Sequence, residues 1–344
     1  MKSLLLALLA LYPALAASQD KLKIEGIAPG EEVVVMLFGR TSAGCMNGSS
    51  DPEKTTFSTT GELLLGNMLS KGRCRSQAVA VFSKKHAMKW QSLNWTNQPG
   101  DVRTIKLDPL IDAALNIWVT NDADKLLAEE HAQRAQNIFL DNRVGVRLVP
   151  KVQKLSDVPG APSNAVQIVN SGLVDDNFLE CSHLAAIRAQ PFYVAKTLNV
   201  YYVSRPFTGR NCALKNLDFG ECPTSADGEF TRADANITFI GTKANPTTLA
   251  HELGHAYGLR PQSCGGHVSG PDFPDNMMST DVSTGTGPRN KLTLGQVFRM
   301  NTHKDGWGGT MLIRNNIPKR VAQTCFPNQP PPGAGCPALE HPWP

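Results

Sequence analysis

The sequence lacks any apolar run long enough to cross a membrane, which takes roughly 20 residues. The apolar run at its start, Leu4 to Leu15, is shorter than that. Lys2 precedes this run, and Ala14-Leu15-Ala16 offers small residues for cleavage. This layout is typical of a secretory signal peptide. The sequence therefore predicts a signal peptide over residues 1–17 and a secreted, extracellular protein (periplasmic in a bacterium) with no membrane span.

Blocks of like charge are also missing. The 344 residues carry a formal net charge of +4, only 19% of them are charged, and the lysines and arginines are scattered. This pattern argues against nucleic acid as a partner. Neither a Gly-rich phosphate loop nor a G-x-S-x-G motif occurs, which argues against nucleotide and serine-hydrolase chemistry.

Closely spaced cysteine pairs are the third absence. The eight cysteines are even in number and widely spaced, with no C-x-x-C pair, so a cysteine metal cluster is disfavoured. Disulfide bonds in an oxidising compartment explain them better. Connectivity does not follow from sequence, but nearness in the chain favours Cys45–Cys74, Cys212–Cys222 and Cys325–Cys336, which leaves Cys181 for Cys264.

Two regions with different patterns follow the predicted signal peptide. Residues 18–108 have the character of a small β-rich domain, with strands expected over 31–38, 78–82 and 102–107 between Gly- and Asn-rich turns. No catalytic constellation occurs in this region. A propeptide, a binding module and a structural cap all remain open as its role.

A strand–helix–strand pattern begins near residue 110. A strand is expected over 116–120, then a helix capped by Asn121, then a strand over 144–149. Short connections of this kind predict a parallel βαβ unit. Further elements are expected as a helix over 175–189 and strands over 198–203 and 236–240, before a Pro-rich tail over 313–344.

The segment His251-Glu252-Leu253-Gly254-His255 carries the clearest chemical pattern. Asn245 with Pro246 predicts the start of a helix, and Gly258 predicts its end. Residues four apart share a helix face, so His251 and His255 could bind one zinc ion. Glu252, turned by about 100° from His251, could act as general base on a metal-activated water. The alternative is a surface helix with two solvated histidines.

A catalytic zinc needs a third protein ligand. No glutamate occurs between Glu252 and Glu340, so an arrangement with a downstream glutamate is excluded. The remaining candidates for the third ligand are His267, Asp272, Asp275 and His303.

The segment from His251 to Leu259 resembles the zinc helix of the metzincins, HExxHxxGxxH or HExxHxxGxxD. Asn276-Met277-Met278-Ser279 resembles their Met-turn, with Met278 in the place of the characteristic methionine. Residues 292–301 resemble the helix after that turn, where Thr293 and Gln296 predict a capping box. The resemblance covers about residues 112–305.

The resemblance implies an α+β fold. Its metzincin-like catalytic domain, over 109–312, would hold a twisted mixed sheet with an antiparallel edge strand at 236–240, the zinc helix and a C-terminal helix, preceded by the β-rich domain. It departs from the family at Pro261, which stands where the third ligand would fall and cannot bind zinc. A short insertion would bring His267 to that place, so His267 is favoured and Asp272 is next.

The resemblance further implies a secreted zinc-dependent endopeptidase with one catalytic Zn²⁺, which hydrolyses extended polypeptides with Glu252 as general base. The alternative is a catalytically weak or inactive peptidase-like binding protein. The remaining histidines, among them His86, His131 and His183, show no ligand spacing and are assigned to surface or helix positions.

Overall fold

The computed structural model describes residues 20–38, 52–58, 60–64, 78–93, 100–171, 186–195, 197–203, 237–241, 244–257, 259, 275–279 and 288–302. The predicted signal peptide, all eight cysteines and the Pro-rich tail lie outside the described residues. The chain forms two compact units divided between Asp108 and Pro109, and the segment Phe82–Met88 belongs with the second unit.

The first unit contains two β-sheets. A three-stranded sheet has the order β4-β1-β7, and a four-stranded sheet has the order β3-β2-β5-β6. The strands predicted over 31–38, 78–82 and 102–107 are confirmed as β2, β5 and β7. The strands are β1 (Lys21–Glu25), β2 (Val33–Phe38), β3 (Pro52–Ser58), β4 (Glu62–Leu64), β5 (Ala78–Ser83), β6 (Lys89–Ser92) and β7 (Val102–Lys106).

One apolar core joins the two sheets of this unit. Side chains alternate across β1, so Leu22 and Ile24 are buried while their neighbours are more exposed. They pack in one cluster with Val33 and Val35 of β2 and with Ile105 of β7. The unit is therefore a sandwich of two sheets, and its first strand lies in the middle of one of them.

The second unit is built on a four-stranded parallel sheet. Its strands are β8 (Ile111–Val119), β9 (Val146–Lys154), β10 (Leu198–Val203) and β11 (Ile237–Gly241), in the order β11-β10-β8-β9. Helix α1 (Asp122–Asp141) connects β8 to β9, which run parallel, so the predicted βαβ unit is confirmed. Asn121 caps α1 as predicted, because its side chain accepts from the Asp124 N–H at 3.0 Å.

The direction of β11 corrects one expectation. The predicted antiparallel edge strand at 236–240 is instead a strand that pairs in parallel with β10. Parallel neighbours need a long crossover connection, and the chain between residues 203 and 237 supplies that length. Within the described part of this sheet, all three pairings are parallel.

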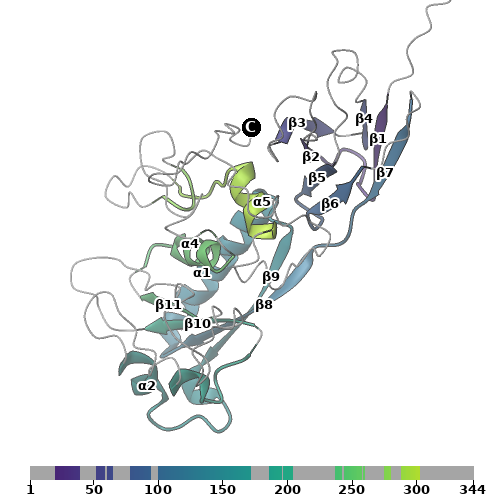
Figure 1. Ribbon diagram of the computed structural model, residues 1–344. Helices are drawn as coiled ribbons and strands as arrows, with labels where there is room; N and C mark the ends of the chain where they lie inside the picture. The colour runs from purple at the N-terminus through teal and green to yellow at the C-terminus, as the bar shows by residue number, and fades with distance from the viewer. Residues whose placement is uncertain are drawn as a thin grey trace, which may run out of the picture. The chain divides into compact units, whose positions relative to one another are not determined.

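Helices cover both faces of this sheet. On one face, Tyr202 of β10 meets His131 of α1, and α1 also contacts α4 (Thr248–Ala256), as Figure 1 shows. On the other face, Tyr201 packs in a cluster that includes Val169 of α2 (Ala165–Ser171). Every residue of β10 is buried, as expected for a parallel sheet covered on both sides. His131 lies on a helix, one of the two kinds of position predicted for it, and its side chain is fully buried.

Two further helical segments are described, at residues 186–188 and after β9. Of the helix predicted over 175–189, residues 186–188 are described and helical, and most of the rest lies outside the described residues. A short 3-10 helix, η1 (Leu155–Asp157), follows β9. Among the helices that the structure describes, none has the length and apolar character needed to cross a membrane.

Asn142, directly after α1, anchors the segment that leads into α5 (Leu294–Thr302). Its amide donates to the Ile138 carbonyl at 2.8 Å and to the Asn290 carbonyl at 2.7 Å, and its oxygen accepts from the Leu292 N–H at 2.7 Å. One buried amide thereby fixes the approach to α5 against the end of α1.

The segment Phe82–Met88 completes the core of the second unit. Phe82 is fully buried and stacks edge-on against Phe298 of α5, with ring centroids 6.5 Å apart. Gly145 has a φ of +82°, and a Cβ added there would lie 2.6 Å from the Met88 nitrogen. This approach leaves room for no side chain larger than glycine's hydrogen at position 145.

Candidate metal centre

Helix α4 begins one turn after its predicted cap. The Asn245 side-chain oxygen accepts from the Thr247 N–H at 2.9 Å, which closes an Asx turn just before the helix. The Thr248 N–H bonds to the Asn245 carbonyl in a tighter turn, and the α-helix proper runs Thr248–Ala256. The residue at the cap of α4 is therefore Thr247, which makes no side-chain capping bond, and the predicted helix start at Asn245-Pro246 is wrong.

The end of α4 has the hydrogen bond of a Schellman motif. The Leu259 N–H donates to the Gly254 carbonyl at 3.0 Å, across the position at which such motifs favour glycine. Gly258 itself lies outside the described residues. Just after α4, Tyr257 stacks edge-on against Phe139 of α1, with ring centroids 5.6 Å apart, and this contact ties the end of the helix to its neighbour.

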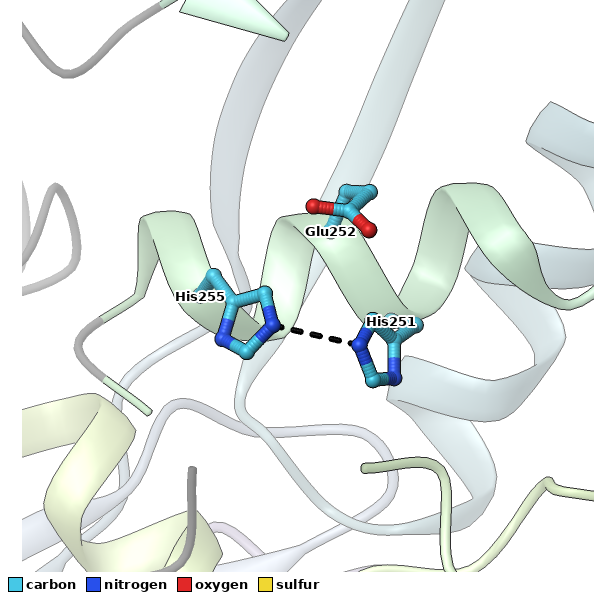
Figure 2. Close-up of side chains that lie close together, drawn as sticks. All are labelled: His251, Glu252 and His255. Atoms are coloured by element: carbon cyan, nitrogen blue, oxygen red, sulfur yellow. Dashed lines mark hydrogen bonds between the residues drawn. The ribbon is translucent and has the colours of Figure 1, made fainter. Parts of the chain in front are cut away.

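The two imidazoles of α4 lie side by side on one face of the helix (Figure 2). The Nε2 atoms of His251 and His255 are 3.1 Å apart, and the ring planes are nearly perpendicular at 88°. Both side chains are buried, each with 8% of its surface exposed. His251 and His255 therefore share one face of α4, as their four-residue spacing predicts.

Backbone carbonyls face the other nitrogen of each ring. The Met277 carbonyl oxygen lies 2.9 Å from His251 Nδ1, and the Leu259 carbonyl oxygen lies against His255 Nδ1. An imidazole that donates from Nδ1 to a carbonyl presents its Nε2 lone pair, which is the state that binds metals. Two such lone pairs can converge on one point here.

Glu252 completes the group. Its carboxylate and the two imidazoles have ligand atoms that all lie within 4.8 Å of one another, and within the described residues no other such group occurs. Glu252 is 5% exposed and projects from a different face of the helix than the two rings (Figure 2). A buried carboxylate beside two nitrogen donors can accept a proton from a molecule held between them.

The turn over 275–279 lies beneath α4. Met277 and Met278 are fully buried, and a Cβ added to Gly254 would lie 2.8 Å from the Met277 methyl and 2.5 Å from the Met278 sulfur. The glycine between the two histidines thus lets the turn approach the helix. Met278 was predicted to lie below the site, whereas the role of the Met277 carbonyl was missed, because a backbone acceptor leaves no signal in the sequence.

The predicted capping box of α5 is confirmed and also reaches the turn. The Thr293 N–H donates to Gln296 Oε1 at 2.8 Å, and the Gln296 N–H donates to Thr293 Oγ1 at 3.1 Å. The Gln296 amide also exchanges two hydrogen bonds with the Asn276 amide, at 2.9 and 3.2 Å. Since Asn276 Oδ1 accepts from the Met278 N–H at 2.9 Å, the cap of α5 shapes the turn below the histidines.

Arg289 is a site residue that the sequence analysis missed. Its Nη2 donates to the Ser279 carbonyl at 2.6 Å and lies 3.0 Å from His251 Nδ1. Burial lowers the pKa of Arg289, and the charge of Glu252 acts in the opposite direction. No motif surrounds Arg289, so only the folded chain brings its side chain to the histidines.

Of the four candidates for a third ligand, only Asp275 is among the residues that the structure describes. His267, Asp272 and His303, like Pro261, lie outside the described residues. Asp275 pairs with Lys291 at 3.4 Å and is not part of the group formed by the two histidines and Glu252.

Comparisons of the chain with protein-family models, with curated proteins and with solved structures find no match.

Proposed function

We propose that the chain is a secreted zinc-dependent endopeptidase of metzincin type, in which His251 and His255 hold the metal and Glu252 is the general base. The observation that carries the proposal is the pair of Nε2 atoms at 3.1 Å, each on a ring whose Nδ1 faces a backbone carbonyl. The remaining ligand would be His267, with Asp272 as the second choice.

The donor set fits zinc. Two nitrogens on a tetrahedral zinc, at about 2.0–2.1 Å from the ion, lie roughly 3.3 Å from each other, which is close to the separation seen between the two rings. Neutral imidazoles are borderline donors of the kind that zinc takes. When bound, the ion would supply a Lewis acid that lowers the pKa of water and polarises a carbonyl.

The protein's own groups would do the remaining work. Carbonyls of Met277 and Leu259 hold the rings in place. Glu252, buried beside them, would take a proton from the attacking water and deliver it to the leaving amine. An extended polypeptide is the proposed substrate, because β11 is an edge strand of the described sheet and such an edge can bind a peptide by strand addition.

Replacing Glu252 with Gln tests this mechanism. The variant keeps the size of the side chain and removes the base, so we expect cleavage of a peptide library to fall at least about 100-fold. Zinc content, measured by atomic absorption, should stay at one ion per chain. Glu129→Gln, an exposed carboxylate on α1, is the matched control and should leave cleavage unchanged.

A peptidase-like binding protein is the second candidate, and the proline at position 261 favours it, since that residue cannot serve as a ligand. The same experiment separates the two. Wild-type protein that binds zinc but cleaves no library member, or that binds no zinc at all, would support the binding protein and contradict the peptidase.

A further inference from the structure

His251 Nδ1 has two neighbours of opposite character. The Met277 carbonyl at 2.9 Å can only accept a hydrogen bond, and Arg289 Nη2 at 3.0 Å can only donate one. A neutral imidazole carries a single N–H. The ring can therefore satisfy one of these neighbours through Nδ1 at a time, and the choice decides which atom carries the proton.

The contact with Arg289 belongs to a continuous chain of hydrogen bonds. If His251 Nδ1 accepts from Arg289, its proton lies on Nε2 and can be donated to His255 Nε2 at 3.1 Å. His255 then carries its proton on Nδ1 and donates it to the Leu259 carbonyl. In this arrangement His251 has an N–H at Nε2 in place of a lone pair, and the two rings are joined by a hydrogen bond.

The alternative arrangement is the one that suits a metal. With its proton on Nδ1, His251 donates to Met277, and both Nε2 atoms present lone pairs. The bond between the rings is then lost, and so is the bond from Arg289. The distance of 3.1 Å between the two Nε2 atoms suits both arrangements. The proton of His251 therefore changes from one ring nitrogen to the other without movement of the rings.

Arg289 is held in place by more than this contact. Its Nη2 donates to the Ser279 carbonyl, and the next residue, Asn290, is anchored by Asn142. The backbone of Arg289 has a φ of +42°, in the left-handed region that non-glycine residues rarely adopt. A strained residue with a partly buried charge persists only where the surroundings determine it.

We propose that Arg289 is an internal competitor of the metal, which stabilises the metal-free arrangement of His251 and thereby lowers the affinity of the centre for zinc. The inference rests on the proposed zinc site. Two effects of Arg289 both weaken zinc binding. Its hydrogen bond to His251 Nδ1 favours the arrangement in which His251 has no Nε2 lone pair for the metal. Its positive charge also lies close to the position that the zinc ion would take, and like charges repel. At a given concentration of free zinc, less metal is then bound than at a site without the arginine.

The first test needs no metal. In metal-free protein labelled with nitrogen-15 in histidine, imidazole chemical shifts report which ring nitrogen carries the proton. We expect His251 to carry it on Nε2 in the wild type and on Nδ1 in Arg289→Met. A wild-type His251 protonated on Nδ1 would overturn the inference, and this result does not depend on the folding of any variant.

The second test measures zinc affinity by competition with a chromophoric chelator. Arg289→Met should bind zinc about tenfold more tightly, the low end for loss of a hydrogen bond to a charged group. A variant that merely damaged the fold would bind more weakly, so the sign of the change is decisive. Weaker or unchanged binding would overturn the inference.

Lys291→Met is the matched control. It removes a cation from the same segment, but Lys291 pairs with Asp275 and its side chain is 58% exposed. Its zinc affinity should equal that of the wild type, and an equal tightening in both variants would contradict a role specific to the His251 contact. Wild-type protein that binds no zinc would contradict the proposed function itself. A failure of the proposed function can thus be told apart from a failure of the inference about Arg289.

Discussion

Gly254 of α4 lies so close to Met278 that a Cβ added to the glycine would meet the methionine sulfur at 2.5 Å. Alanine is the better helix former by about 1 kcal/mol, but overpacking a buried contact costs about 1–3 kcal/mol. We expect Gly254→Ala to lower the free energy of unfolding by about 1 kcal/mol, as measured by urea denaturation. The same substitution should cost less in a Met278→Ala background, and equal costs in both backgrounds would contradict the contact.

Gln296 should matter more than an ordinary capping residue. Replacing Thr293 with Ala removes a cap and should cost about 1 kcal/mol. Replacing Gln296 with Ala also removes two hydrogen bonds of the buried Asn276 amide, so its cost should reach about 2–3 kcal/mol. Thermal unfolding of the two variants, measured side by side, tests the order. A larger loss for Thr293→Ala would show that the Asn276 link contributes little.

The buried His131 predicts a loss of stability in mild acid. Burial lowers its pKa below the ordinary 6.5, with a smaller opposing effect of Glu130. Above pH 6.5 the ring is neutral in both the folded and the unfolded state. As the pH falls below 6.5, the unfolded chain takes up a proton that the folded state resists, so stability decreases until the lowered pKa is passed.

His131→Gln tests this expectation, because glutamine can still bond Tyr202 but does not titrate. The wild type should lose more unfolding free energy between pH 7.5 and pH 5 than the variant does. Tyr202→Phe serves as control: it removes the hydrogen bond of 3.0 Å and leaves the titrating ring in place. Identical pH profiles for wild type and His131→Gln would refute the assignment.

The third ligand of the proposed zinc site can be identified by stoichiometry. We expect His267→Ala to lose the bound ion or to weaken its binding by orders of magnitude, because three protein ligands are the norm for a catalytic zinc. Asp272→Ala should retain it. Full zinc occupancy in the first variant would reject His267, and loss in the second would favour Asp272.

Local patterns predicted much of the second unit. The periodicity of α1 and the Asn121 cap gave the βαβ unit, and the spacing of Thr293 and Gln296 gave a cap that the structure confirms. These features depend on neighbours in sequence. The first turn of α4 was misjudged because Asn245 can cap a tight turn as well as a helix.

Features that depend on distant parts of the chain were not predictable. The direction of β11 follows from a long crossover and not from its five residues. Arg289 reaches His251 from 38 residues away in the chain, on a segment that Asn142 helps to anchor. The same holds for the Met277 carbonyl, since any residue type offers that acceptor and no side-chain pattern marks it.

The segment Phe82–Met88 bears on how the chain can be processed. It lies before the boundary at Asp108, yet Phe82 is packed against α5 within the second unit. Cutting the chain at that boundary and discarding what precedes it would remove an aromatic side chain from the core of the unit that contains the candidate metal centre. A fragment that begins at Pro109 should therefore unfold at lower denaturant than the whole protein. If the protein were activated by removal of the N-terminal unit, the same cleavage would lower the stability of the second unit.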